Sequence, residues 1–261
     1  MAGPAVFTVI KPRQWLLREP SISAPQETEL LFGHCFHAQP HARQKQHKDW
    51  VYGQELSPLG QGIEGYTGWM RRSSLTHDAA PHTHVISALK APVFPKLSIK
   101  SHIKRVLPMG AQIAATPARE PFLKLASGGY VHQSHVRPIG TYDEDDFVSV
   151  AARHYGLPYI WGGVSSDGLD CSGLVQSALR AVGRDCLRDA GQQEKSLGVA
   201  VTRGAALQRA DLIFWPGHVG ILEDAKSLLH ANAFHMRVER EPLRAAIKRI
   251  GEPSSIRRLT K

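Results

Sequence analysis

The stretch GLDCSGLVQSAL, from Gly168 to Leu179, places a lone cysteine where a turn becomes a helix. The preceding letters SSDGLD are typical of a turn, and the apolar side chains that follow recur on one helical face. These apolar residues are Leu174, Val175, Ala178 and Leu179. A side chain at a helix N-terminus lies at the positive end of the helix dipole, which favours thiolate over thiol. Position alone leaves Cys171 equally consistent with a structural residue and with a nucleophile.

The composition is that of an ordinary globular protein. The chain has 261 residues, 42% hydrophobic and 21% charged, which is enough for two or three domains with buried cores. Its longest apolar stretches are far shorter than a membrane span. The net charge of +9 comes from basic residues that are scattered along the chain, which favours a solvated surface over a nucleic-acid interface. We therefore expect neither nucleic acid nor a membrane as a partner.

The three cysteines, Cys35, Cys171 and Cys186, are too few for a disulfide framework and fit a reducing compartment. The N-terminal sequence MAGPAVFTVIKPRQWLLREP lacks the basic, apolar and small-residue regions of an export signal. Both observations predict a cytoplasmic protein.

The two halves of the chain differ in pattern. Residues 1–140 contain short β-prone runs broken by turn signals, such as FTVI, WVYGQ, GYTGWM and GGYVHQSHV, and we expect two small β-barrels over residues 5–80 and 81–140. Residues 141–261 begin with two helices, DEDDFVSVAARHYG and CSGLVQSALRAVG, each ended by a glycine. The β runs ADLIFW, HVGILED, SLLHANAF and MRVEREPL follow. This order predicts an α+β domain with an antiparallel sheet.

Two histidines are candidates for the base that a nucleophilic cysteine needs. His218 opens one predicted strand and His230 lies in the next, and twelve residues separate them. This interval suits one antiparallel strand plus a turn, so the imidazoles could lie side by side in a papain-like arrangement with Cys171. Either histidine could instead satisfy a strand edge. A zinc site of these three residues is disfavoured, because no CxxC or His-x3-His spacing accompanies it.

The C-terminal motifs resemble one family. YIWGGVSSDGLDCSGLVQSAL, ADLIFWPGHVGI and LLHANAFHM are similar to the NlpC/P60 family of cysteine peptidases. Upstream, LLREP, ELLFGH, DWVYGQ and EGYTGWM resemble a first bacterial SH3 domain, and GGYVHQSHV resembles the end of a second. The resemblance implies two SH3-like β-barrels followed by a papain-like α+β domain.

The resemblance also implies roles for individual residues. Cys171 would be the nucleophile, His218 the base and His230 the residue that orients it. Asp170 and Ser172 would contact the N-terminal end of the substrate.

Two tyrosines carry further roles by the same resemblance. Tyr66 would help to cap the substrate amine, and Tyr159 would assist the oxyanion. The plainer alternatives are a helix N-cap for Asp170 and a barrel-surface aromatic for Tyr66.

The chain departs from the family pattern at two places. His34 stands where relatives often have an acidic residue, in a histidine-rich run that we interpret as a solvated loop rather than a metal site. Ala190 stands where relatives often have a serine after Arg188 and Asp189. Neither change alters the three catalytic candidates.

The resulting hypothesis is a cysteine endopeptidase of murein peptide recycling, with neither metal nor cofactor. Its substrate would be a peptidoglycan stem peptide with a free N-terminal L-Ala, cut between γ-D-glutamate and a diamino acid such as meso-diaminopimelate. Two alternatives stay open: a cell-wall peptide-binding protein with a vestigial peptidase domain, and an acyltransferase on the same fold. The sequence leaves the oligomeric state undetermined.

Overall fold

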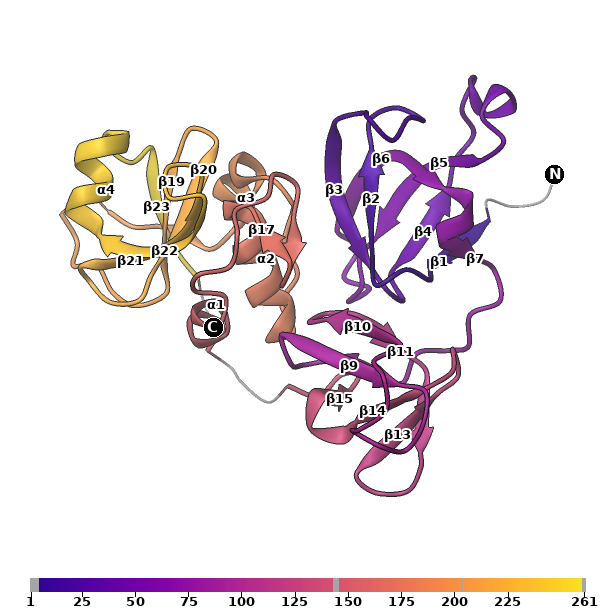
Figure 1. Cartoon of the computed structure of the whole chain (residues 1–261). Coiled ribbons are helices and arrows are strands. Elements are labelled where there is room, and N and C mark those ends of the chain that lie inside the picture. The colour runs from indigo at the N-terminus through magenta and orange to yellow at the C-terminus, as the bar shows by residue number, and fades with distance from the viewer. Residues whose placement is uncertain (1–4, 143–145, 203, 260–261) are drawn as a thin grey trace. The chain divides into compact units, whose positions relative to one another are not determined.

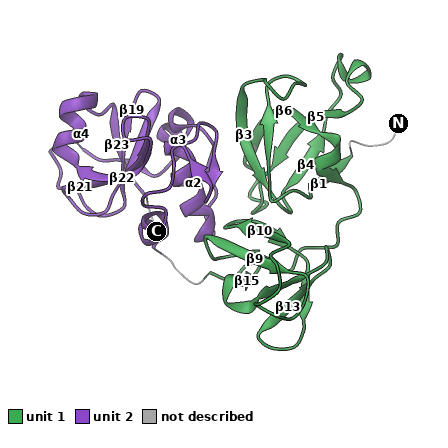
Figure 2. Cartoon of the chain, viewed as in Figure 1, with its two compact units in different colours: residues 1–143 green, residues 144–261 purple. Residues whose placement is uncertain are grey.

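The computed structural model describes residues 5–142, 146–202 and 204–259. The chain divides into two compact units, residues 1–143 and 144–261 (Figure 2). The first is built of β-strands, and the second combines helices with an antiparallel sheet (Figure 1). Within the described residues, no helix combines the length and the apolar character needed to cross a membrane.

The first part of the β unit is a seven-stranded antiparallel sheet with the order β3-β2-β6-β5-β4-β1-β7. Its strands are β1 (Val6–Val9), β2 (Arg13–Leu17), β3 (Gln26–Leu31), β4 (Cys35–Ala38), β5 (Trp50–Leu56), β6 (Glu64–Arg71) and β7 (Leu75–Thr76). Short 3-10 turns lie at Gln44–Gln46 and Arg72–Ser74. Burial alternates along most of β5, as expected of a strand with one face on a core. Phe36, Leu16, Leu30 and Met70 are fully buried there.

The second part of the β unit has a five-stranded sheet, β10-β9-β14-β13-β12, and a three-stranded sheet, β11-β8-β15. Their bounds are β8 (His84–Ile86), β9 (Lys90–Phe94), β10 (Arg105–Pro108), β11 (Gln112–Ile113), β12 (Ala115–Pro117), β13 (Phe122–Leu125), β14 (Tyr130–His132) and β15 (Val136–Pro138). A 3-10 turn, Gln133–His135, precedes β15. The predicted β-rich N-terminal region is confirmed; its division into domains at residues 80 and 81 stays a prediction.

The histidine-rich run is not a solvated loop. His34 is 2% exposed, and its Nε2 lies 3.3 Å from the carbonyl of Gly110 in the second part of the β unit. His41 packs its ring 4.4 Å from Tyr52 and 4.8 Å from Trp69, between ring centroids. The sequence prediction was wrong for His34, which is buried, and His41 packs against aromatic rings although it is only partly buried.

The C-terminal unit contains a six-stranded sheet with the order β18-β23-β19-β20-β21-β22. The strands are β18 (Val199–Ala200), β19 (Asp211–Trp215), β20 (His218–Leu222), β21 (Ser227–Asn232), β22 (Arg237–Pro242) and β23 (Ser255–Arg258). A small hairpin pairs β16 (Val164–Ser165) with β17 (Gly168–Leu169). Every residue of β19 is buried, so both faces of the sheet are covered at this central strand. The four predicted β runs and their antiparallel order are confirmed.

Four helices complete this unit: α1 (Phe147–Ala152), α2 (Cys171–Ala181), α3 (Ala190–Ser196) and α4 (Leu243–Ile250). Helix α1 is shorter than predicted: Asp146 caps it from outside, accepting from the Val148 amide at 3.0 Å. The other acidic residues predicted for its first turn, 143–145, lie outside the described residues. Helices α3 and α4 were not predicted. Leu243 and Ala246 of α4 pack against Ile213 and Trp215 of the sheet.

Candidate active site

The geometry at the start of α2 explains the letters DCSG. The Asp170 carboxylate accepts from the Gly173 amide at 2.7 Å, which is a side-chain N-cap. Gly173 must be glycine, because a Cβ there would lie 2.1 Å from the carbonyl oxygen of Gly163. The predicted apolar face is confirmed, since Leu174, Val175, Ala178 and Leu179 are fully buried. These contacts hold Cys171 at the first position of the helix.

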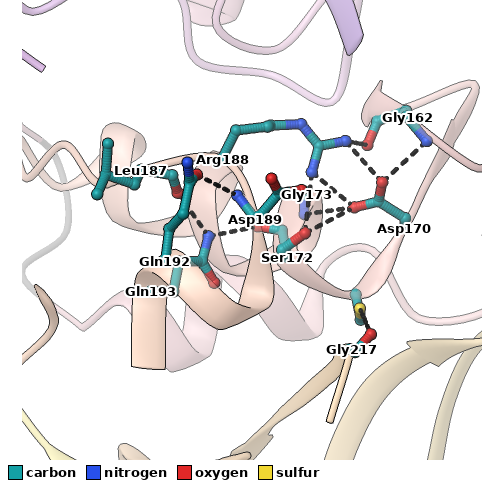
Figure 3. A network of polar contacts seen from close by, with 12 residues as sticks. Gly162, Asp170, Ser172, Gly173, Leu187, Arg188, Asp189, Gln192, Gln193 and Gly217 are labelled. Carbon is teal, nitrogen blue, oxygen red and sulfur yellow. Dashed lines mark hydrogen bonds and ion pairs between the residues drawn. The ribbon is translucent and has the colours of Figure 1, made fainter. Parts of the chain in front are cut away.

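A buried ion pair supports the same helix end. Arg188 donates to both oxygens of Asp170, at 2.8 and 2.7 Å, and also to the Ser172 hydroxyl at 3.0 Å (Figure 3). The Gly162 amide donates to the same carboxylate at 2.9 Å. Side-chain exposure is 5% for Arg188 and 9% for Asp170. The N-cap alternative for Asp170 is therefore what the structure contains, while contacts of Asp170 and Ser172 with substrate stay predictions.

The sulphur of Cys171 lies beside the backbone that carries His218. Cys171 is 7% exposed, and its Sγ is 4.0 Å from the carbonyl oxygen of Gly217. The backbone amide of Val219, on the other side of His218, hydrogen-bonds to the sulphur and lowers its pKa. Burial outweighs this effect and raises the pKa of Cys171 to about 11. Burial therefore acts against the thiolate that the helix N-terminus favours.

Two histidines and a glutamate form one hydrogen-bonded chain. Nε2 of His218 lies 2.8 Å from Nδ1 of His230, and Nε2 of His230 lies 2.8 Å from Oε1 of Glu241. The three residues come from adjacent strands β20, β21 and β22. Gly220 leaves room for the neighbouring strand β21, because a Cβ there would lie 2.6 Å from Cδ1 of Leu228. The predicted pairing of the imidazoles is confirmed, although their catalytic roles stay predictions.

Both imidazoles are neutral at neutral pH. Burial is the largest cause that lowers the pKa of His218 and that of His230, each to about 3. The positive charge of Arg249 acts in the same direction on both. A neutral imidazole next to a neutral thiol is suited to general-base catalysis, in which the proton moves as the sulphur attacks.

The two tyrosines lie in different units. Tyr159 is half-buried next to β17, and the charges of Cys171 and Asp170 add to burial in raising its pKa to about 12. Its hydroxyl therefore keeps its proton and can donate to an oxyanion. Tyr66 lies on β6 and packs against the apolar core of the first sheet. Its contact with substrate stays a prediction.

Two residues of the site were not predicted. Arg188 lies between α2 and α3 in a segment without periodicity, so only the Arg188–Asp189 pair of the family pattern pointed to it. Glu241 shares a strand face with Glu239, and the sequence does not distinguish them.

The zinc site considered from the sequence is not formed. Among the described residues, the one cluster of metal-ligand atoms is that of His230, His235 and Glu241, which includes neither Cys171 nor His218.

The site lies within the part of the chain that matches a family model. Residues 156–249 match the NlpC/P60 family. A solved NlpC/P60 family protein from Bacillus cereus ATCC 10987 has the same fold, with a TM-score of 0.80 and 22% identity. The match covers 98% of this chain and 100% of that one.

Curated relatives extend the similarity beyond the matched domain. Gamma-D-glutamyl-L-lysine dipeptidyl-peptidase from Bacillus subtilis (strain 168) is 30% identical over 196 residues, 67% of this chain and 62% of that protein. Dipeptidyl-peptidase 6 from Lysinibacillus sphaericus is 29% identical over 238 residues, 83% of this chain and 84% of that protein. The chain spans 62% and 65% of the lengths of the Bacillus subtilis enzyme and a Bacillus cereus counterpart. Because residues 156–249 match the family model and contain Cys171 and both histidines, this domain of the chain belongs to the NlpC/P60 family of cysteine peptidases.

Proposed function

We propose that this chain is a cysteine peptidase that hydrolyses the bond between γ-D-glutamate and a diamino acid in cell-wall peptides. The observation that carries the proposal is the 2.8 Å contact between Nε2 of His218 and Nδ1 of His230. His218 opens β20, and the sulphur of Cys171 lies 4.0 Å from the carbonyl oxygen of the preceding residue, Gly217. A nucleophile, a base and a group that orients the base are the parts that acyl transfer needs. The substrate class is supported by the names of the Bacillus relatives, gamma-D-glutamyl-L-lysine dipeptidyl-peptidases.

In the first step, His218 takes the proton of the Cys171 thiol while the sulphur attacks the γ-carbonyl carbon of D-glutamate. The carbon–nitrogen bond then breaks, and the protonated His218 gives its proton to the departing amine of the diamino acid. This leaves a thioester between the γ-glutamyl group and Cys171.

In the second step, His218 removes a proton from water as the water attacks the thioester, and the thiol leaves with that proton. In both steps the negative charge on the carbonyl oxygen needs donors. Backbone amides at the start of α2 and the Tyr159 hydroxyl are our candidates.

We further propose that the substrate is a free peptide with an N-terminal L-Ala, cut in the cytoplasm during murein recycling. A dipeptidyl-peptidase releases two residues from an N-terminus, so its substrate carries a free amine. A buried ammonium needs acceptors to replace water. Tyr66 is our candidate for one of them, and meso-diaminopimelate is our candidate for the diamino acid.

The test is a cleavage assay with three peptides: L-Ala-γ-D-Glu-meso-diaminopimelate, its L-lysine counterpart, and the first peptide acetylated at its alanine. Release of the free diamino acid is followed by mass spectrometry. We expect cleavage of the free-amine peptides and none after Cys171→Ala. Cys35→Ala is the matched control, since this half-buried cysteine lies in the β unit and should leave turnover unchanged.

Each alternative predicts a different result. Turnover that survives Cys171→Ala would refute the proposed chemistry, and binding without any turnover would favour a vestigial peptidase domain. Equal cleavage of the acetylated peptide would remove the free-amine requirement. Transfer of the dipeptide to an added amine, in place of hydrolysis, would favour the acyltransferase.

A further inference from the structure

We propose that Glu241 is a positioning residue that fixes which nitrogen carries the proton in both histidines, so that His218 presents an unprotonated Nδ1 to the thiol. This inference rests on the proposed function for its catalytic consequence. The proton arrangement itself is a property of the substrate-free protein. Glu241 contacts His230 and does not contact Cys171 or His218 directly.

The direction of each hydrogen bond from His218 through His230 to Glu241 follows from the group that donates to Glu241. Arg249 has only donors, and its guanidinium bonds to the same Glu241 oxygen that His230 contacts. That oxygen is therefore an acceptor, and Nε2 of His230 must donate to it. Since a neutral imidazole has a single N–H, Nδ1 of His230 is unprotonated and accepts from Nε2 of His218. His218 then has its only proton on Nε2, which leaves Nδ1 as a base.

The unprotonated Nδ1 is the nitrogen that remains for the thiol. Nε2 of His218 is occupied by His230, and among the described residues the structure gives Nδ1 no hydrogen-bond partner. The sulphur of Cys171 contacts the backbone on both sides of His218, at Gly217 and Val219. In the opposite tautomer Nδ1 would carry a proton and could not accept another.

The register of the strands explains why Glu241, and not Glu239, holds this position. Glu239 is the residue directly paired with His230 across β21 and β22, and Glu241 is two residues further on the same face. Arg237 binds the Glu239 carboxylate at 2.7 Å, and the same carboxylate accepts from the backbone amide of Arg240 at 2.9 Å. Glu239 is thus directed away from the imidazole, whereas Glu241 reaches it diagonally.

Other charged and titratable groups near His230 do not supply the same contact. Arg249 lies on α4 and contacts Glu241 from there. Its guanidinium carbon lies 4.5 Å from the centroid of the Phe234 ring. His235 hydrogen-bonds to Asn232 through Nδ1 at 3.0 Å. Within the described residues, Glu241 is the acceptor that meets His230 Nε2.

The experiment measures the tautomers and the kinetics of the full chain in matched variants. Nitrogen NMR of the imidazoles, without substrate, should find the proton of His218 and of His230 on Nε2 in the wild type. Glu241→Leu removes the acceptor, so a second tautomer should appear at both histidines. The kcat for the free-amine peptide should fall about 10- to 100-fold, the range seen when the hydrogen-bond partner that orients a metal-bound histidine is removed, with KM unchanged.

Two further variants distinguish the positioning role of Glu241 from an effect of its negative charge and from a general loss of stability. Glu241→Gln keeps an oxygen that accepts from Arg249 and His230, so it should retain the wild-type tautomers and most of kcat. Glu239→Leu, the matched control on the same strand, should change neither. Thermal melting of each variant verifies that it folds.

The outcomes distinguish this inference from the proposed function. A wild-type His218 with its proton on Nδ1 would overturn the inference, whether or not the variants fold. Loss of kcat in Glu241→Gln equal to that in Glu241→Leu would show a role of charge and would also overturn it. If the tautomers are as expected but no peptide is cleaved, the proposed function fails and the proton arrangement stands.

Discussion

Replacement of Arg188 by methionine tests whether the buried ion pair holds the start of α2. The substitution keeps an unbranched apolar stem but leaves the Asp170 carboxylate, 9% exposed, without its cation. Breaking a buried pair by removing one partner costs about 3–5 kcal/mol. For a unit of the length of residues 144–261, an unfolding entropy of about 0.25 kcal/mol/K converts this loss into a decrease in Tm of about 12–20 °C.

The assay is differential scanning calorimetry, combined with hydrogen exchange of peptides from α2 to assign the transition to this unit. Arg209→Met is the matched control, because the Arg209–Asp146 pair is exposed, with side-chain exposures of 45% and 44%, and should cost at most about 1 kcal/mol. The double variant Asp170→Asn/Arg188→Met removes both charges and should regain part of the stability. If the Tm of Arg188→Met equals the Tm of Arg209→Met, the reasoning is refuted.

Two other predictions follow from burial and from backbone proximity. Burial lowers the pKa of His154 to about 4, below its ordinary value of 6.5, so the unfolded chain binds more protons between these values. The free energy of unfolding should therefore fall by up to about 3 kcal/mol as pH drops through this range. In His154→Leu the accompanying decrease in Tm should be smaller. Identical profiles of Tm against pH in the wild type and the variant would contradict this. Gly173→Ala should prevent stable folding because of the 2.1 Å approach to Gly163, whereas Gly191→Ala in α3, with open space around it, should stabilise by about 0.5 kcal/mol. Chemical denaturation compares the free energies of unfolding of the Gly173→Ala and Gly191→Ala variants. Equal values would show that the helix moves away from Gly163 without loss of stability.

The catalytic candidates could be predicted from the sequence because local patterns specify them. The helix that begins at Cys171 has an N-cap and an apolar face within eleven residues. His218 and His230 lie at strand positions whose spacing brings them side by side. Periodicity and the order of the elements place these side chains, and the resemblance to the NlpC/P60 family assigns their roles.

The supporting residues could not be predicted in the same way, since they depend on contacts between distant segments. Arg188 reaches Asp170 across eighteen residues from a segment without regular structure. Glu241 is distinguished from Glu239 by strand register and by the arginines that each contacts, among them Arg249 of a helix that sequence patterns did not reveal. Likewise, His34 is buried by the second part of the β unit, which its own segment does not indicate.

The electrostatics at the start of α2 favour a protonated Cys171 over a preformed thiolate. The helix dipole favours a charged group at its N-terminus by about 0.3–1 kcal/mol. A rise in the pKa of Cys171 from 9.0 to about 11 corresponds to about 3 kcal/mol, so burial is the larger effect. The N-cap Asp170 adds to the rise and Arg188 opposes it, so the two members of the ion pair act in opposite directions on the sulphur. The thiol therefore keeps its proton until a base accepts it, and the only nitrogen of His218 free to do so is the one that the His230–Glu241 chain leaves unprotonated.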